Sequence, residues 1–342
     1  MQKFFGSFFQ KRTSCLAALD RPLGTAQPRI VNKVVIVYRA GFALLAAYLI
    51  SFAAHATCAT SPAASLPLSI VDEKLLIPAS LNGSAEQLAL DTGAGITVIS
   101  TDAAGRLDIP HDFDHAAQLG GVCGASSVLY IGQVDALDLA GLHFAHQSFP
   151  IVDMPLRTAQ GALVAGFLGA DVLHQFDVDL NIPGGRLDLW RNTGCTDAQP
   201  PWQDPASPIQ FDLDAGNHIL VPFKVDGVNL TAVLDTGAPW LSITTRAAYR
   251  AGVTDDDMEN DPTIHGTGVN NRAWSGHIHK FNDIQFAGAA FPGLPAEIVP
   301  STGVAAYDGL GGADALIGLR LLRNARIWIS YRNKTIYLAP VH

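Results

Sequence analysis

The chain has 342 residues, of which 48% are apolar and only 15% are charged, so it can build a large core and is too apolar to be disordered. The formal net charge is −9, but residues 1–56 hold seven basic residues and one acidic residue, which leaves 15 basic and 30 acidic residues in the remainder. A body with a net charge of −15 repels phosphate backbones, which argues against nucleic-acid binding.

Residues 1–56 have the pattern of a targeting segment. Arg39 precedes an apolar run, Gly41–Ala54, and the run ends in Ala54-His55-Ala56. A basic flank, an apolar stretch and a small-x-small site are the parts of a secretory signal peptide. The alternative is a membrane anchor, although the run is shorter than the roughly 20 residues that a bilayer needs. We therefore expect an exported protein, periplasmic or secreted, that contacts a membrane only if this segment stays uncleaved.

Two cysteines, Cys123 and Cys195, lie in the body of the chain. A disulfide bond between them is compatible with an oxidising compartment, but their spacing does not require one. No Cys-x-x-Cys or Cys/His pattern of a metal site is present.

Four histidines form the pairs His143/His146 and His277/His279. Either pair could bind a metal if a third ligand converged on it, but both fall in segments where solvated polar residues are expected. We expect no metal and no cofactor.

An internal repeat organises the body of the chain. At a shift of 144 residues, Leu76–Gly83 matches Leu220–Gly227, and Leu90-Asp91-Thr92-Gly93-Ala94 matches Leu234-Asp235-Thr236-Gly237-Ala238. The shift grows to 149 where Phe167-Leu168-Gly169 matches Leu316-Ile317-Gly318, as loops take up insertions. The period is far too long for a solenoid. We predict an N-terminal lobe at 62–192, a linker rich in Pro, Asp and Ser at 193–205, and a C-terminal lobe at 206–342.

The residue pattern within each lobe predicts short strands and an all-β fold. LLIPASLNG (75–83) and ILVPFKVDG (219–227) end in Asn-Gly and Asp-Gly, the strongest short hairpin signals. Each lobe closes with a predicted hairpin, at 178–190 and 327–338. Helix signals are limited to Arg246–Ala251 and to the residues after Gly169 and Gly318.

The two Asp-Thr-Gly triplets carry the candidate chemistry. A single such triplet reads as a plain turn, because Asp favours turns and Gly supplies conformational freedom. Here the triplet occurs twice in register between apolar runs, where an unpaired carboxylate is costly. Two carboxylates at hydrogen-bonding distance share one proton, so Asp91 and Asp235 could act as base and acid on a water and a carbonyl. The aspartic-protease dyad is the established example of this pairing.

The other triplet residues fit a supporting role. Gly93 and Gly237 would let the chain turn tightly beneath the carboxylates. Thr92 and Thr236 have short hydroxyls that would bond to backbone across a two-fold axis and lock the turns together.

With these motifs, residues 70–340 resemble the pepsin/retropepsin superfamily, and most closely two fused retropepsin-like halves of the kind found in some bacterial proteins. The resemblance implies two closed, β-barrel-like lobes with the active site between them and Gly169 and Gly318 packed beneath the catalytic turns. It also implies flexible hairpins over the substrate, for which the candidates are Gly121, Gly124, Gly266 and Gly268. The alternative for these glycines is ordinary turns.

Two departures from the pepsin pattern affect the expected chemistry. No clear equivalent of the pepsin flap tyrosine is present, and Tyr130 is the nearest residue of that type. Ala94 and Ala238 follow the triplets, as in retropepsins, where pepsins usually have Ser or Thr. The loss of a hydroxyl donor to the carboxylate should raise the pKa values of the pair.

The sequence thus favours a monomeric aspartic endopeptidase that acts on a peptide or protein substrate, because one chain supplies both halves of the site. The alternative is a catalytically silent peptide-binding protein of the same fold. A third hypothesis is a membrane-held enzyme that processes one specific partner.

Overall fold

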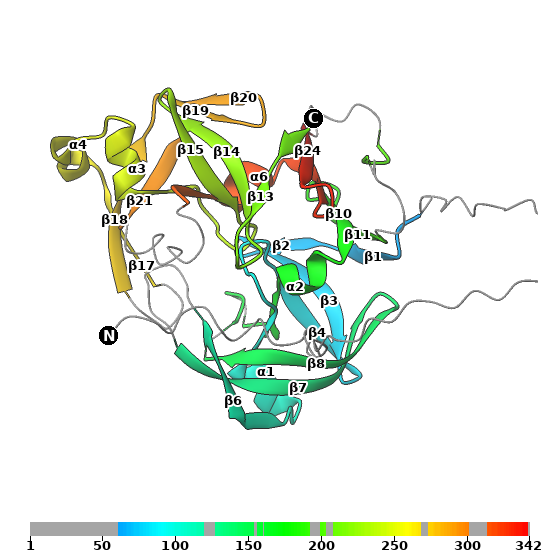
Figure 1. Cartoon of the computed structure of the whole chain (residues 1–342). Coiled ribbons are helices and arrows are strands. Elements are labelled where there is room, and N and C mark those ends of the chain that lie inside the picture. Colours follow the sequence, from blue (N-terminus) through cyan, green and yellow to red (C-terminus); the bar gives the residue numbers. More distant parts are fainter. Residues whose placement is uncertain are drawn as a thin grey trace, which may run out of the picture. The chain divides into compact units, whose positions relative to one another are not determined.

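The computed structural model describes residues 61–119, 127–153, 156–159, 161–191, 199–202, 208–267, 273–300 and 313–340. These residues form a mostly β structure with short helices between the strands (Figure 1), which confirms the predicted fold class. The predicted leader and most of the predicted linker lie outside them. Within the described ranges, no helix is long and apolar enough to cross a membrane.

The N-terminal lobe contains a closed barrel. Its strands are β2 (Ser69–Val71), β3 (Lys74–Leu81), β4 (Ser84–Leu90), β5 (Val98–Ser100), β6 (His111–Leu119), β7 (Ser127–Leu139), β8 (Leu142–Val152) and β9 (Gly166–Leu168). Pairing runs from β3 through β4, β9, β5 and β8 to β7. The ring closes because β7 returns to β3, where Leu137 and Asp138 pair with Leu81 and Ser80.

The C-terminal lobe repeats this order with two interruptions. Its strands are β13 (Asp212–Leu213), β14 (Ile219–Val225), β15 (Val228–Leu234), β16 (Ser242–Thr244), β17 (Thr263–Thr267), β18 (Ala273–Lys280), β19 (Asp283–Phe286), β20 (Ala289–Pro292), β21 (Pro295–Val299) and β22 (Ala315–Ile317). Breaks at Phe281-Asn282 and Gly293-Leu294 divide the counterparts of β7 and β8 into two strands each. The pairing of β19 with β14 corresponds to that of β7 with β3 in the N-terminal lobe.

The predicted hairpin turns are present in both lobes. Asn82 and Gly83 join β3 to β4 with φ angles of 50° and 81°, and Asp226 and Gly227 join β14 to β15 with 44° and 82°. Two consecutive positive φ angles match the twist of the flanking strands and suit Asn-Gly and Asp-Gly.

The helices are short. They are α1 (Thr101–Arg106), α2 (Ala170–Leu173), α3 (Thr245–Arg250), α4 (Asp255–Asn260) and α6 (Leu319–Leu322). The sequence predicted α2, α3 and α6 but missed α1 and α4. Both carry readable N-terminal signals: Ser100 caps α1 by accepting from the Ala103 N–H, and Thr254 with Asp257 forms a capping box at α4.

A third sheet joins the lobes. Its strands, in order across the sheet, are β1 (Ala64–Pro67), β11 (Arg186–Arg191), β10 (Phe176–Asn181), β23 (Ala325–Ser330), β24 (Thr335–Pro340) and β12 (Ile209–Gln210). The predicted closing hairpins, β10–β11 and β23–β24, meet where β10 pairs antiparallel with β23. One cluster of buried apolar side chains continues through both lobes, from Ala64 to Leu338.

An ion pair crosses the β10–β23 junction. The Arg326 guanidinium donates from Nε and Nη2 to the two oxygens of Asp179, at 2.9 and 2.6 Å. Asp179 is only 1% exposed, and a buried carboxylate is tolerated only when it is paired in this way.

We expect Asp179→Ala to lower the free energy of unfolding by about 3 kcal/mol, because Arg326 would keep a charge at the lobe junction without its partner. Arg157→Ala is the control, since it removes an ion pair to Asp102 in which both side chains are about half exposed and should cost under about 1 kcal/mol. Denaturant unfolding measures the free energy of unfolding of both variants. Equal decreases would show that the Asp179–Arg326 pair stabilises the protein no more than an exposed ion pair does.

Candidate active site

The two Asp-Thr-Gly turns follow the ends of equivalent strands. Asp91 comes directly after β4 and Asp235 directly after β15. The Asp91 N–H donates to Leu168 in β9 at 3.1 Å, and the Asp235 N–H donates to Ile317 in β22 at 3.0 Å. Each carboxyl group is therefore carried on backbone that is still held by a neighbouring strand.

Reciprocal threonine hydrogen bonds tie the turns of the two lobes together. The Thr92 hydroxyl donates to the Leu234 carbonyl at 2.7 Å and accepts from the Thr236 N–H at 3.1 Å. The Thr236 hydroxyl donates to the Leu90 carbonyl at 2.9 Å and accepts from the Thr92 N–H at 3.0 Å. Both threonines are at most 1% exposed, so solvent does not compete for these bonds.

The turn glycines give each carboxyl group room beside the opposite turn. A Cβ atom on Gly93 would lie 2.3 Å from Cγ of Asp235, and one on Gly237 would lie 2.3 Å from an oxygen of Asp91. Neither glycine has a positive φ angle. The sequence predicted glycine here for a tight turn; the structure instead requires it for the close approach of the other lobe's carboxylate.

Gly169 and Gly318 pack against the segments that follow the Asp-Thr-Gly turns. A Cβ atom on Gly169 would lie 2.5 Å from the Ile96 carbonyl carbon, and one on Gly318 would lie 2.0 Å from the Trp240 oxygen. The next N–H in each lobe, that of Ala170 or Leu319, donates to the residue after the triplet at 2.8 or 2.7 Å. Any side chain at either glycine would push the Asp-Thr-Gly turn of its lobe out of place.

The two carboxyl groups are hydrogen-bonded to each other and titrate as a pair. Burial raises the pKa of Asp91 well above its usual value, and the Asp235 charge and the shared hydrogen bond raise it further. Burial also raises the pKa of Asp235, but there the Ala238 N–H, the Asp91 carboxyl, the Gly237 N–H and His218 oppose the change. Burial therefore favours the protonated form of both groups, and the pair shares a proton.

Sequence reasoning missed His218, which lies near enough to Asp235 to lower its pKa. Its side chain is largely buried, and Nδ1 is 3.0 Å from both carboxylate oxygens of Asp214. The loop that carries Asp214 also reaches the other lobe, because a Cβ atom on Gly95 would lie 2.1 Å from the Gly216 oxygen. No motif marks His218, since the equivalent position of the N-terminal lobe is Lys74.

Of the flap candidates, only Gly266 lies within the described residues, where it sits in β17 opposite Trp274 of β18. A Cβ atom on Gly266 would lie 2.4 Å from the Trp274 ring, so contact with an aromatic side chain explains this glycine. Gly121, Gly124 and Gly268 fall outside the described residues, as do Cys123 and Cys195. Tyr130 lies on β7 and is 47% exposed.

One histidine of each predicted pair contacts a carboxylate. His143 Nδ1 contacts Asp138 at 2.9 Å, and His279 Nδ1 contacts Asp261 at 2.7 Å. In the parts of the chain that the structure describes, no group of three His, Cys, Asp or Glu residues is arranged to hold a metal ion.

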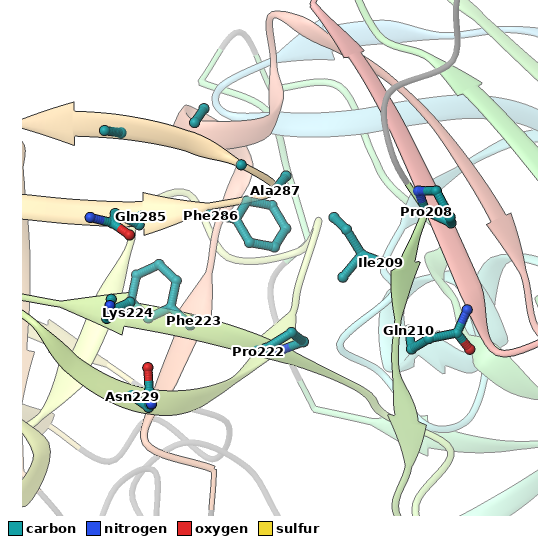
Figure 2. Close-up of a pocket in the computed structure, with 13 residues that line it drawn as sticks. Pro208, Ile209, Gln210, Pro222, Phe223, Lys224, Asn229, Gln285, Phe286 and Ala287 are labelled. Carbon is teal, nitrogen blue, oxygen red and sulfur yellow. The ribbon is translucent and has the colours of Figure 1, made fainter.

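A hollow of about 650 Å³ lies elsewhere in the molecule, beside β12, β14 and the β19–β20 hairpin (Figure 2). Phe223 and Phe286 lie on its floor, and Pro208 and Ile209 border it on the opposite side. None of its lining residues belongs to either Asp-Thr-Gly turn, so the candidate active site is distinct from this hollow.

We expect Thr92→Val to lower the free energy of unfolding by about 2 kcal/mol, because it removes two buried hydrogen bonds of about 1 kcal/mol each. Thr236→Val should behave alike, since the contacts are reciprocal. Thr92→Ser, which keeps the hydroxyl, is the matched control for denaturant unfolding. A serine variant as unstable as the valine variant would show that the hydroxyl contacts do not stabilise the turns.

The comparison with protein families agrees with this arrangement. The model described as "Aspartyl protease" matches residues 77–172 and 221–321, more than half of the chain and one match per lobe. A comparison with curated proteins gives no match. Each matched range begins in the first long strand of a lobe and includes the Asp-Thr-Gly turn. The chain belongs to the aspartyl protease family and consists of two retropepsin-like halves.

Proposed function

We propose that the protein is an aspartic endopeptidase that hydrolyses peptide bonds with Asp91 and Asp235 as its catalytic residues. The observation that supports the proposal is the mutual hydrogen bond of two carboxyl groups contributed by different lobes, of which Asp235 is buried and Asp91 partly buried. A structural role alone would be better served by apolar residues, since buried carboxylates cost free energy unless they are fully paired.

The hydrogen bonds to each carboxyl group support an assignment of the two roles, because Asp91 accepts the Gly93 N–H at 2.9 Å and Asp235 accepts one N–H more. Asp235, whose carboxylate accepts the N–H groups of Gly237 and Ala238 at 2.9 and 3.0 Å, holds the negative charge and takes a proton from a bound water. Protonated Asp91 donates a hydrogen bond to the carbonyl oxygen of the substrate. The water oxygen bonds to the carbonyl carbon, and the tetrahedral intermediate then breaks at the C–N bond as the nitrogen receives the proton that Asp235 took from the water. Neither a metal nor a covalent enzyme intermediate takes part.

We also propose that the protein acts outside the cytoplasm, after export directed by the Gly41–Ala54 segment. The basic flank and the small-x-small site in the sequence support this part of the proposal. The proposed substrate is a peptide or a protein, and the proposed active form is a monomer, because both carboxyl groups come from one chain.

The activity test compares wild type with Asp91→Asn and Asp235→Asn in a peptide-library digestion read by mass spectrometry. We expect each variant to lose at least about 1,000-fold in kcat/KM, because an amide can neither share the proton nor activate water. Asp256→Asn, on the exposed face of α4, is the control for the loss of one carboxylate. Full activity in both dyad variants would refute the catalytic pair, and a wild type that binds peptides without cleaving them would favour a binding protein.

The pH dependence gives a second test. Activity needs one proton on the pair, so it falls at low pH as the pair gains its second proton and at high pH as the pair loses its last one. Because burial raises the pKa of both groups, we expect the profile of kcat/KM to lie at higher pH than that of pepsin. A profile that peaks at about pH 2 would contradict this. Ala238→Ser adds a possible hydroxyl donor and should move the profile toward acid.

A further inference from the structure

The catalytic carboxyl group of the C-terminal lobe shares a sheet face with side chains outside the main core. Leu234 belongs to the main buried cluster, whereas Val233 belongs to a smaller cluster with Leu316. Successive side chains of a strand point to opposite faces, so Asp235 lies on the same face as Val233. We call this the catalytic face; it is the side of the sheet turned away from the barrel core.

The pairing of neighbouring strands shows that Glu297 also lies on the catalytic face. Val233 pairs with Leu316 of β22, Leu316 with Ser242 of β16, and Ser242 with Glu297 of β21. The immediate neighbours of Ser242 and Glu297 in sequence belong to the main core, which leaves these two side chains on the opposite face. A half-buried carboxylate thus lies three strands across from the strand that carries Asp235.

The equivalent positions of the N-terminal lobe are apolar. Ala89 pairs with Phe167 of β9, and Phe167 pairs with Val98 of β5. The register of β5 with β8 then places Val98 beside Pro150. Phe167 and Val98 pack in a small apolar cluster with Val152. The duplicated lobes therefore offer chemically different surfaces on the two sides of the carboxyl pair.

Among the residues that the structure describes, Glu297 has no ion-pair partner of its own. The Ser242 hydroxyl donates to Glu297 at 2.9 Å. The nearby Arg320 is occupied by Glu73 of the other lobe, to which Nε and Nη2 donate at 2.8 and 2.5 Å, and its guanidinium lies 3.2 Å from the centre of the Trp240 ring. Two carboxylates therefore share one cation. Burial raises the pKa of Glu297, with smaller effects from Ser242, Arg320 and Glu73.

We propose that Glu297 selects substrates with a Lys or Arg side chain on the side of the cleavage site that the C-terminal lobe binds. The inference rests on the proposed peptidase function. Three strand spacings separate β15 from β21, about 14 Å, which an extended peptide covers in about four residues, or fewer when a long basic side chain reaches outward. A cationic side chain would supply the charge that the cluster lacks, and an acidic body would attract basic peptides over longer distances.

The cleavage experiment uses two peptide libraries that are identical except that one position holds Lys in the first and the uncharged norleucine in the second. We expect wild type to cleave the Lys peptides with a kcat/KM at least about tenfold higher at one position, and Glu297→Gln to lose that preference. Glu259→Gln, an exposed carboxylate on α4, is the matched control and should keep it. Glu297→Lys should favour peptides with Glu at the same position.

A binding measurement separates this inference from the peptidase proposal. Asp235→Asn, expected to bind without cleaving, is titrated with labelled Lys and norleucine peptides with and without the additional Glu297→Gln change. A Lys preference that depends on Glu297 supports the inference even if wild type cleaves nothing. Equal binding of both peptides by Asp235→Asn overturns it, as does a Lys preference that survives Glu297→Gln. Thermal unfolding checks that the Gln variants are folded.

Discussion

The architecture depends on the reciprocal hydrogen bonds between Thr92 and Thr236. Each hydroxyl donates to a carbonyl that precedes the opposite carboxylate and accepts the N–H of the opposite threonine. Two acidic side chains would not stay together unaided, because burial and like charge both oppose it. The threonine bonds fix the backbone on either side, so the carboxyl groups relieve their repulsion by sharing a proton and not by moving apart. The threonine hydrogen bonds thus hold the backbone of the two turns rigid while the carboxyl groups repel each other.

The lobes are connected at more places than the active site. The β2–β3 turn supplies Glu73 to Arg320 of the C-terminal lobe, and the β13–β14 loop places Gly216 against Gly95 of the N-terminal lobe. The two connections are related by the internal repeat but use different chemistry, an ion pair in one and backbone contact in the other. A fused duplication permits this divergence, whereas a homodimer of one lobe must use the same residue on both sides.

Much of this structure could be predicted because it depends on local signals that occur twice. Asn82-Gly83 and Asp226-Gly227 specify their turns through the φ angles that they permit, and the repeat at 144 residues aligned Asp91 with Asp235. The capping box at Thr254 is an equally local signal, but helix α4, which it begins, was not predicted. The sequence could not predict why Gly93 is required, because the group that occupies the space beside it is the carboxyl group of Asp235, which follows a strand far along the chain. For the same reason, the sequence could not predict where His218, Arg320 and Glu297 lie. Their positions follow from the pairing of distant strands.

The sheet that joins the lobes also affects how the molecule reaches its active form. Its central pair, β10 with β23, brings together Asp179 and Trp328, residues that are separated by most of the second lobe. Contacts between such distant segments form slowly, because the intervening chain must be ordered first. A chain that folds from its N-terminus would complete the first barrel while the second carboxyl group is still unfolded. The pair of carboxyl groups therefore forms only once the second lobe has folded, and a chain with only its first lobe folded holds half of the proposed site.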